Sequence, residues 1–321
     1  MRVRSLGDLE PQRGRTVVIN AHTDLVTTRA LLSAVELGGQ PVLLVNCDPP
    51  AAGAAHFDRV AQSHGFDVLE APLKLHGQTL DRLFTELRDD RLLLLDSDAE
   101  IRDPGLVPWM HDMLDHPRVY GAGFTQGPHR APEHWPRPAG TVLYMERPWV
   151  PCTMLRVSHV KEAMAAGRTF VPQFVPNDLG AGRRVSNFLA ARWGPPWAPH
   201  SKKFNALPAA VRQRAKSWRL DRLAPLRSSY YRVLRPSMAF YDTAADVHEH
   251  LRFERGLLYA GIPFELAGDR VHHYEGVSRY QLVGAMVDDT PPDAIHQELV
   301  DHLRTRYGYS WPFGGPEVVD P

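Results

Sequence analysis

The chain has 321 residues, of which 43% are hydrophobic and 23% charged, so it is long enough to bury a sizeable core and too apolar to be disordered. Its 37 basic and 37 acidic residues balance, which gives no overall attraction to nucleic acid or to a membrane. The two cysteines, Cys47 and Cys152, exclude a disulfide scaffold and a cysteine-based zinc module. No apolar run reaches the roughly 18 residues of a membrane-spanning helix, and the first residues lack the apolar core of a signal peptide, so we expect a cytoplasmic protein.

Residues 1–100 alternate between short apolar runs and amphipathic stretches of helical length. We expect strands at 16–20, 41–46, 66–69 and 92–95, and helices at 24–37, 54–65 and 79–89. Strands that alternate with helices predict right-handed βαβ units, and uninterrupted apolar strands predict a sheet covered on both faces. The expected fold class is therefore α/β, with a Rossmann-type, mostly parallel sheet flanked by helices.

The pattern is looser after residue 100. We expect a helix at 106–115, a strand at 119–125, a proline-rich loop at 127–151 with a strand at 141–145, a strand and helix at 153–166, a helix at 243–260 and a strand at 263–271. The segment 202–235 holds ten Lys or Arg residues and one acid. It is either a solvated face or a contact for an anionic acceptor or lipid head group, and no nucleic-acid motif accompanies it.

Four leucines at 92–95 lead directly into Asp96, Ser97 and Asp98. The leucines predict a buried strand, and in open α/β sheets ligands bind at the carboxyl ends of the strands. Two acids in that place repel each other unless a cation lies beside them, and Mg²⁺ and Mn²⁺ combine carboxylate ligands with phosphate oxygens. We therefore expect Asp96 and Asp98 to bind Mn²⁺ or Mg²⁺. The alternative is that Asp96 caps the next segment and Asp98 is solvated.

The position of this motif on the fourth strand, together with VVINAH at 17–22 and PVLLVNCD at 41–48, resembles the glycosyltransferases of the GT-A fold. Within that fold the chain is similar to the large inverting bacterial family, and the resemblance covers residues 16–125 and 238–280. It implies that the ends of the first strands hold the nucleoside of a nucleoside diphosphate sugar. The candidate nucleotide contacts are Asn20, Ala21, Asp48, Asp96 and Ser97.

The resembling family often ends its catalytic domain with H-x-x-G-x-S, whose histidine is a further metal ligand. This chain has HYEGVS at 273–278. Neutral imidazole is a suitable ligand for Mn²⁺, so His273 joins Asp96 and Asp98 as a candidate ligand. The neighbouring His272 would point to the other side of a strand. The alternative is that His273 is a packing residue, one of 16 histidines in the chain.

Inverting transfer needs a base that takes the proton of the acceptor hydroxyl as the new bond forms. In the resembling family this base is an acid that opens a helix before the final histidine. Asp242 matches it best, and Asp246, one helical turn later, is the second candidate. The alternative is that Asp242 is only a helix N-cap, a position that Asp favours.

Together these features predict a metal-dependent, inverting glycosyltransferase that moves a sugar from a nucleoside diphosphate sugar to a hydroxyl acceptor, such as a glycan, a lipid-linked sugar or a natural product. Residues 1–125 would form the nucleotide-sugar-binding half. Residues 126–280 would form the acceptor-side half, with 202–235 as a helical and loop insertion, and 281–321 would be a C-terminal extension packed on the same domain. We expect a cytoplasmic location with peripheral membrane contact.

Two other functions remain open at this stage. A nucleotidyltransferase has a similar sheet but usually a glycine-rich loop after the first strand, where this chain has AHTDLVTTR at 21–29. A non-catalytic sugar- or nucleotide-binding protein of the same fold would bind a nucleotide without any dependence on a metal.

Overall fold

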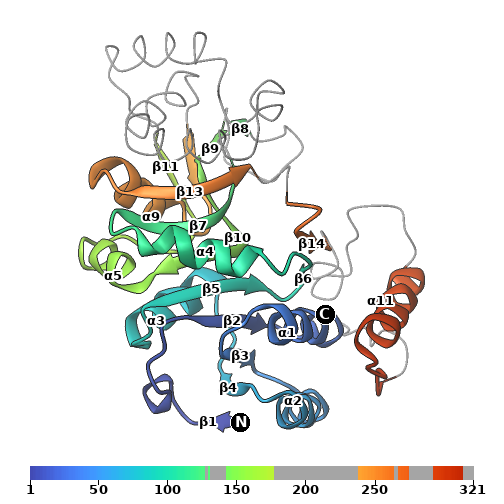
Figure 1. Ribbon diagram of the computed structural model, residues 1–321. Coiled ribbons are helices and arrows are strands. Elements are labelled where there is room, and N and C mark those ends of the chain that lie inside the picture. The colour runs from blue at the N-terminus through green and yellow to red at the C-terminus, as the bar shows by residue number, and fades with distance from the viewer. Residues whose placement is uncertain (127–128, 131–141, 177–237, 264–266, 275–291, 314–321) are drawn as a thin grey trace.

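The computed structural model describes residues 1–126, 129–130, 142–176, 238–263, 267–274 and 292–313. Within these residues an eight-stranded sheet forms the centre of the molecule, in the order β1-β4-β3-β2-β5-β10-β7-β13 (Figure 1). Its strands are β1 (Arg2–Val3), β2 (Arg15–Asn20), β3 (Val42–Cys47), β4 (Asp67–Ala71), β5 (Arg91–Asp96), β7 (Val119–Gln126), β10 (Arg147–Arg156) and β13 (Leu258–Pro263). Neighbouring strands are parallel except at β10, which is antiparallel to β5 and β7. The predicted α/β fold with a mostly parallel sheet is confirmed.

Helices cover both faces of this sheet (Figure 1). One face carries α1 (Asp24–Leu37), α2 (Ala51–His64), α4 (Leu106–Asp115) and α11 (Pro292–Tyr307), and the other carries η1 (Leu6–Asp8), α3 (His76–Glu86), α5 (Val157–Ala165) and α9 (Ala245–Glu249). The leucines of β5 show how the strand serves both faces: Leu93 and Leu95 pack into the first core and Leu92 and Leu94 into the second. A strand buried on both sides has no polar position, which explains its continuous apolar run.

The order of the strands predicts where a ligand binds to the sheet. From β2 the chain adds β3 and then β4 in one direction, and it then returns to place β5 on the other side of β2. The sheet therefore has its topological switch point between β2 and β5, and the crevice outside the carboxyl ends of these two strands is the usual ligand site of such a sheet.

Two smaller sheets bring distant segments together. The strands β11 (Gln173–Pro176), β12 (Met238–Tyr241), β9 (Val142–Tyr144) and β8 (His129–Arg130) form a four-stranded sheet in that order, and β12 ends just before Asp242. The strand β14 (Val271–His273) pairs with β6 (Ala99–Ile101), so that His273 lies opposite Ala99.

The structure corrects three of the predicted elements. The helix predicted at 243–260 is α9, which continues as the π-helical turn η3 (His250–Glu254) and stops before Gly256, a residue with φ +67°. The strand predicted at 263–271 is wrong, because β13 has already ended at Pro263. The loop predicted up to residue 151 contains the first half of β10, whose prolines coincide with an irregular register between Pro148 and Thr153.

Two further sequence features concern the membrane and the basic segment. None of the described helices is long and apolar enough to cross a membrane. The segment 202–235 lies outside the described residues.

Aromatic residues near the end of the described chain enclose a histidine of α2. Tyr309, Trp311 and Phe313 pack edge-on around the imidazole of His56, which is 0% exposed and whose Nε2 lies 2.8 Å from the Thr28 hydroxyl. Burial, with a smaller contribution from a nearby arginine, lowers the pKa of His56 to about 4. The folded protein therefore holds this imidazole in its neutral form.

We expect the free energy of unfolding to decrease as the pH falls from about 6.5 to about 4, because unfolded His56 takes up a proton that the folded protein rejects. At pH 5 the loss due to this group is about 2 kcal/mol relative to pH 7. Urea denaturation at the two pH values should show a smaller pH dependence in His56→Gln than in the wild type. The control is His64→Gln, which removes an exposed histidine from the same helix. A pH dependence unchanged in His56→Gln would contradict this assignment.

Candidate functional site

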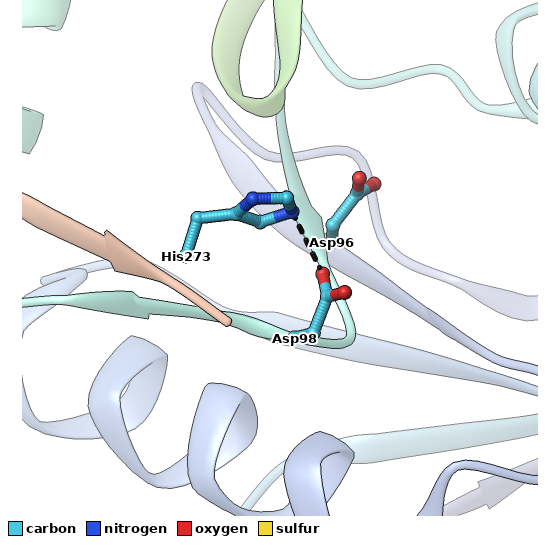
Figure 2. A group of neighbouring side chains, drawn as sticks. All are labelled: Asp96, Asp98 and His273. Atoms are coloured by element: carbon cyan, nitrogen blue, oxygen red, sulfur yellow. Dashed lines mark ion pairs between the residues drawn. The ribbon is translucent and has the colours of Figure 1, made fainter. Parts of the chain in front are cut away.

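Asp96, Asp98 and His273 meet at the carboxyl end of β5 (Figure 2). One potential ligand atom from each side chain lies within 4.8 Å of the other two. His273 Nε2 lies 3.1 Å from Asp98 Oδ1. The sequence predicted these three residues as metal ligands, and the structure brings them together from strands that are far apart in the chain.

The local fold explains this convergence. The buried leucines of β5 carry Asp96 to the edge of the sheet, and the turn that follows places Asp98 at the start of β6. The Tyr274 N–H donates to the Asp98 carbonyl at 2.9 Å, which ties the segment after β14 to the turn. The ring of Trp149 packs edge-on against the His273 imidazole, with 5.2 Å between the ring centroids, and so restrains its orientation.

The electrostatics of this site favour a cation. Burial raises the pKa of Asp96 and the neighbouring Asp98 carboxylate adds to the rise, whereas His76, His273 and Arg147 act in the opposite direction. His76 Nε2 lies 3.9 Å from Asp96 Oδ1. Two carboxylates and one imidazole form a donor set that fits a divalent ion such as Mn²⁺, and a positive charge among them would relieve the repulsion between the acids.

Asp242 joins the same site through an arginine. Its Oδ2 lies 3.0 Å from Nη2 of Arg147, the residue whose charge also acts on Asp96. Arg147, the first residue of β10, pairs with Gln126 at the end of β7, and its charge acts on Asp96 at the same carboxyl edge of the sheet. The N-cap alternative for Asp242 is wrong, since α9 begins at Ala245 and its N-cap position is Ala244.

Asp246 has a different environment. It is 6% exposed, and its two carboxylate oxygens accept hydrogen bonds from Arg168 Nη1 and from the Thr169 N–H, both at 3.2 Å. These contacts connect α9 to the segment after α5. They favour a structural role for Asp246 and leave Asp242 as the better candidate for a base.

Asn20 organises the switch point of the sheet from within. Its side chain is 0% exposed, and its amide nitrogen donates to Asp24 and to Asn46, each at 2.8 Å. Its amide oxygen accepts hydrogen bonds from Thr23 and Thr27. Because this amide is engaged by Asn46 of β3 and by the first turn of α1, direct contact of the side chain with a nucleotide is no longer expected.

The other predicted nucleotide contacts lie at the carboxyl edge of the sheet. Ala21 is partly exposed in the turn after β2, and the Ser97 hydroxyl accepts a hydrogen bond from Thr23 Oγ1 at 3.2 Å. Asp48 is exposed after β3, and its Oδ2 accepts a hydrogen bond from the Leu73 N–H at 2.8 Å. Their contact with a nucleotide stays a prediction.

Sequence analysis missed His76 and Arg147. His76 is the first residue of α3 and follows β4, so the rule that ligands meet the loops after parallel strands would have included it. Arg147 precedes a proline in a stretch with several prolines, and this composition concealed the strand that positions it.

Comparison with known proteins adds little to this description. No protein-family model and no curated protein matches the chain. One solved structure with partial similarity is 4-diphosphocytidyl-2C-methyl-D-erythritol synthase from Anaerococcus prevotii, with a TM-score of 0.36 and 7% identity over 49% of this chain and 75% of that one. Another is a protein named as a glucose-1-phosphate thymidylyltransferase from Bacillus anthracis, in complex with a sucrose, with a TM-score of 0.33 and 10% identity over 47% of this chain and 75% of that one. At these scores the similarity defines neither a family nor an activity.

We expect Asp246→Asn to lower the free energy of unfolding by about 1–3 kcal/mol, because Arg168 and Thr169 lose a buried, charged hydrogen-bond acceptor. The binding of Mn²⁺ by the folded protein should not change. Urea denaturation and Mn²⁺ titration of the same preparation measure the two quantities. Asp112→Asn, an exposed carboxylate on α4, is the control. Weaker Mn²⁺ binding with unchanged stability would place Asp246 in the site instead.

Proposed function

We propose that the protein is a metal-dependent glycosyltransferase that moves a sugar from a nucleoside diphosphate sugar to a hydroxyl acceptor with inversion at the anomeric carbon. The observation that carries this proposal is the acidic and imidazole group Asp96, Asp98 and His273 at the carboxyl end of β5, next to the switch point of the sheet. A diphosphate that lies over this edge meets the three side chains together.

Asp98 and His273, with Asp96 beside them, would hold Mn²⁺ or Mg²⁺. The imidazole in this set favours Mn²⁺, since Mg²⁺ is bound almost entirely through oxygen. When bound, the ion supplies positive charge to the diphosphate and stabilises it as a leaving group. The rest of the reaction depends on side chains of the chain itself.

Arg147 and Asp242 supply the complementary charges. The Arg147 guanidinium lies near Asp96 and can bind phosphate oxygens through several N–H groups at once. Asp242 takes the proton of the acceptor hydroxyl while the oxygen–carbon bond to the sugar forms and the bond to the diphosphate breaks. The 3.0 Å ion pair between Arg147 and Asp242 keeps the leaving-group side and the acceptor side of the reaction adjacent. Ala21 and Asp48, which follow the neighbouring strands β2 and β3, would contact the nucleoside.

The turn after β2 favours this reaction over nucleotidyl transfer. A triphosphate bound there needs free backbone N–H groups and the positive end of a helix dipole. In this chain the turn contains His22, a non-glycine residue whose backbone φ is +61°, and the first residue of α1 is Asp24. A carboxylate at the helix N-terminus opposes a phosphate in the same place.

We expect Asp98→Asn to weaken the binding of Mn²⁺, and of UDP or GDP in the presence of Mn²⁺, by tenfold or more while the protein stays folded, because the variant loses one charged ligand. Isothermal titration gives the affinities, and thermal denaturation reports the fold. Asp112→Asn should bind as the wild type does.

The same titrations separate the other functions. Nucleotide binding that is equal with and without Mn²⁺ would indicate a non-catalytic binding protein. Release of pyrophosphate from a nucleoside triphosphate and a sugar phosphate would indicate a nucleotidyltransferase. Unchanged affinities in Asp98→Asn would contradict the metal site.

We expect Asp242→Asn to reduce turnover by about 10²–10⁴-fold and to leave the affinity for the donor nucleotide within a few fold, because the base acts on the acceptor. Release of the nucleoside diphosphate from a panel of UDP-, GDP- and dTDP-sugars measures turnover. Asp246→Asn is the matched comparison and should retain turnover per folded molecule. Loss of turnover only in Asp246→Asn would exchange the two roles, and normal turnover in both would remove this segment from the chemistry.

A further inference from the structure

A buried carboxylate lies two residues after Asp98 and binds the C-terminal helix. Glu100, on β6, is 2% exposed. Its Oε1 accepts hydrogen bonds from His302 Nε2 and from the Tyr307 hydroxyl, both at 2.7 Å. His302 and Tyr307 belong to α11. We call Glu100, His302 and Tyr307 the Glu100 anchor.

The neighbouring strand β14 is fixed by a buried cation of α1. The guanidinium carbon of Arg29 lies 3.3 Å from the centroid of the Tyr274 ring, and Tyr274 directly follows His273. Arg29 is 0% exposed, and within the described part of the chain none of its three guanidinium nitrogens has a hydrogen-bond partner. Burial lowers the pKa of Arg29, whereas Tyr274 and Glu100 act in the opposite direction. The aromatic ring and the Glu100 carboxylate therefore compensate this charge.

These contacts matter because the strands that carry the metal ligands are short. β6 and β14 have three residues each, and among the described residues they pair with each other in a two-stranded sheet. A two-stranded ladder of this length is marginally stable without packing from outside. The separation of Asp98 and His273 therefore depends on the elements that pack against β6 and β14. Among the described helices, α1 and α11 make the contacts given above.

We propose that α11 is a positioning element of the metal site: through the Glu100 anchor it holds β6, and with it Asp98, at the distance from His273 that a divalent ion requires. His302 and Tyr307 touch no reacting atom and act through Glu100. This inference rests on the metal site of the proposed function.

The test uses variants that keep the charge of Glu100, so that Arg29 is not left as an uncompensated buried cation. Tyr307→Phe and His302→Leu each remove one hydrogen bond to Glu100 Oε1. Glu36→Gln is the matched control on the facing helix α1. It removes the exposed 2.9 Å ion pair between Glu36 and Arg306 of α11, and it leaves in place both the Arg306 guanidinium, 5.1 Å from the centroid of the Tyr307 ring, and the hydrogen bonds of the Glu100 anchor. The probe is Mn²⁺ alone, added to the full chain, with free Mn²⁺ counted by electron paramagnetic resonance.

We expect the Mn²⁺ dissociation constant to rise about tenfold in the double variant Tyr307→Phe/His302→Leu, as is typical when the support of a metal ligand is lost, and to rise less in each single variant. Glu36→Gln should lower the melting temperature without changing the Mn²⁺ dissociation constant. If the double variant does not fold, the single Tyr307→Phe change, which removes one hydroxyl, decides the matter.

The outcomes separate this inference from the proposed function. Wild-type affinity for Mn²⁺ in the folded anchor variants would overturn the inference and leave the metal site standing. Equal weakening of Mn²⁺ binding in Glu36→Gln and in the anchor variants would also overturn it, because the effect would then follow from general loosening of α11. Failure of the wild type itself to bind Mn²⁺ would overturn the metal site and the inference together.

Discussion

The repulsion between Asp96 and Asp98, fixed two positions apart at the end of a buried strand, determines the surroundings of the site. Asp98 is buried and Asp96 is partly exposed, and burial together with the Asp98 carboxylate raises the pKa of Asp96. The groups that oppose this rise come from three different parts of the fold: α3 provides His76, β14 provides His273 and β10 provides Arg147. A site that gathers positive or neutral nitrogen donors around two acids is prepared for an ion and for the phosphates that an ion accompanies.

The direction of β10 makes this gathering possible. In a fully parallel sheet the edge beyond the carboxyl ends receives only residues that follow strands. An antiparallel strand within the sheet places its first residue at this edge. In this way Arg147 of β10 lies beside Gln126 at the end of β7, and its charge acts on Asp96. The same residue pairs with Asp242, which follows β12 of the smaller sheet. The two sheets therefore share one ion pair at the place where the proposed donor and acceptor meet.

Local patterns in the sequence predicted the elements whose residues depend mainly on their neighbours in the chain. The helix expected at 24–37 is α1, Asp24–Leu37, and the four leucines of β5 lie in the two cores as a strand covered on both faces requires. The predictions that were wrong concern elements that depend on tertiary pairing. Leu258 has the spacing of a helical face but pairs with β7 in the sheet. The same limit applies to the site. The sequence pattern ranks Asp242 before Asp246 without excluding either, and the partners Arg147 and Arg168 give the two carboxylates different environments.

Buried polar contacts of the preceding residue in the chain also hold Arg147 in place. The preceding residue, Glu146, is 7% exposed, and its Oε1 lies 3.2 Å from His248 Nε2 and 3.3 Å from Arg252 Nε, both on the α9–η3 segment. Buried ion pairs of this kind add little net stability, because desolvation offsets their attraction, but displacement of one partner leaves a charge uncompensated. The contacts of Glu146 therefore affect the position of Arg147 more than the stability of the fold. The Glu100 anchor acts on Asp98 in the same way, so on both sides of the site a buried carboxylate next to a functional residue ties it to a helix.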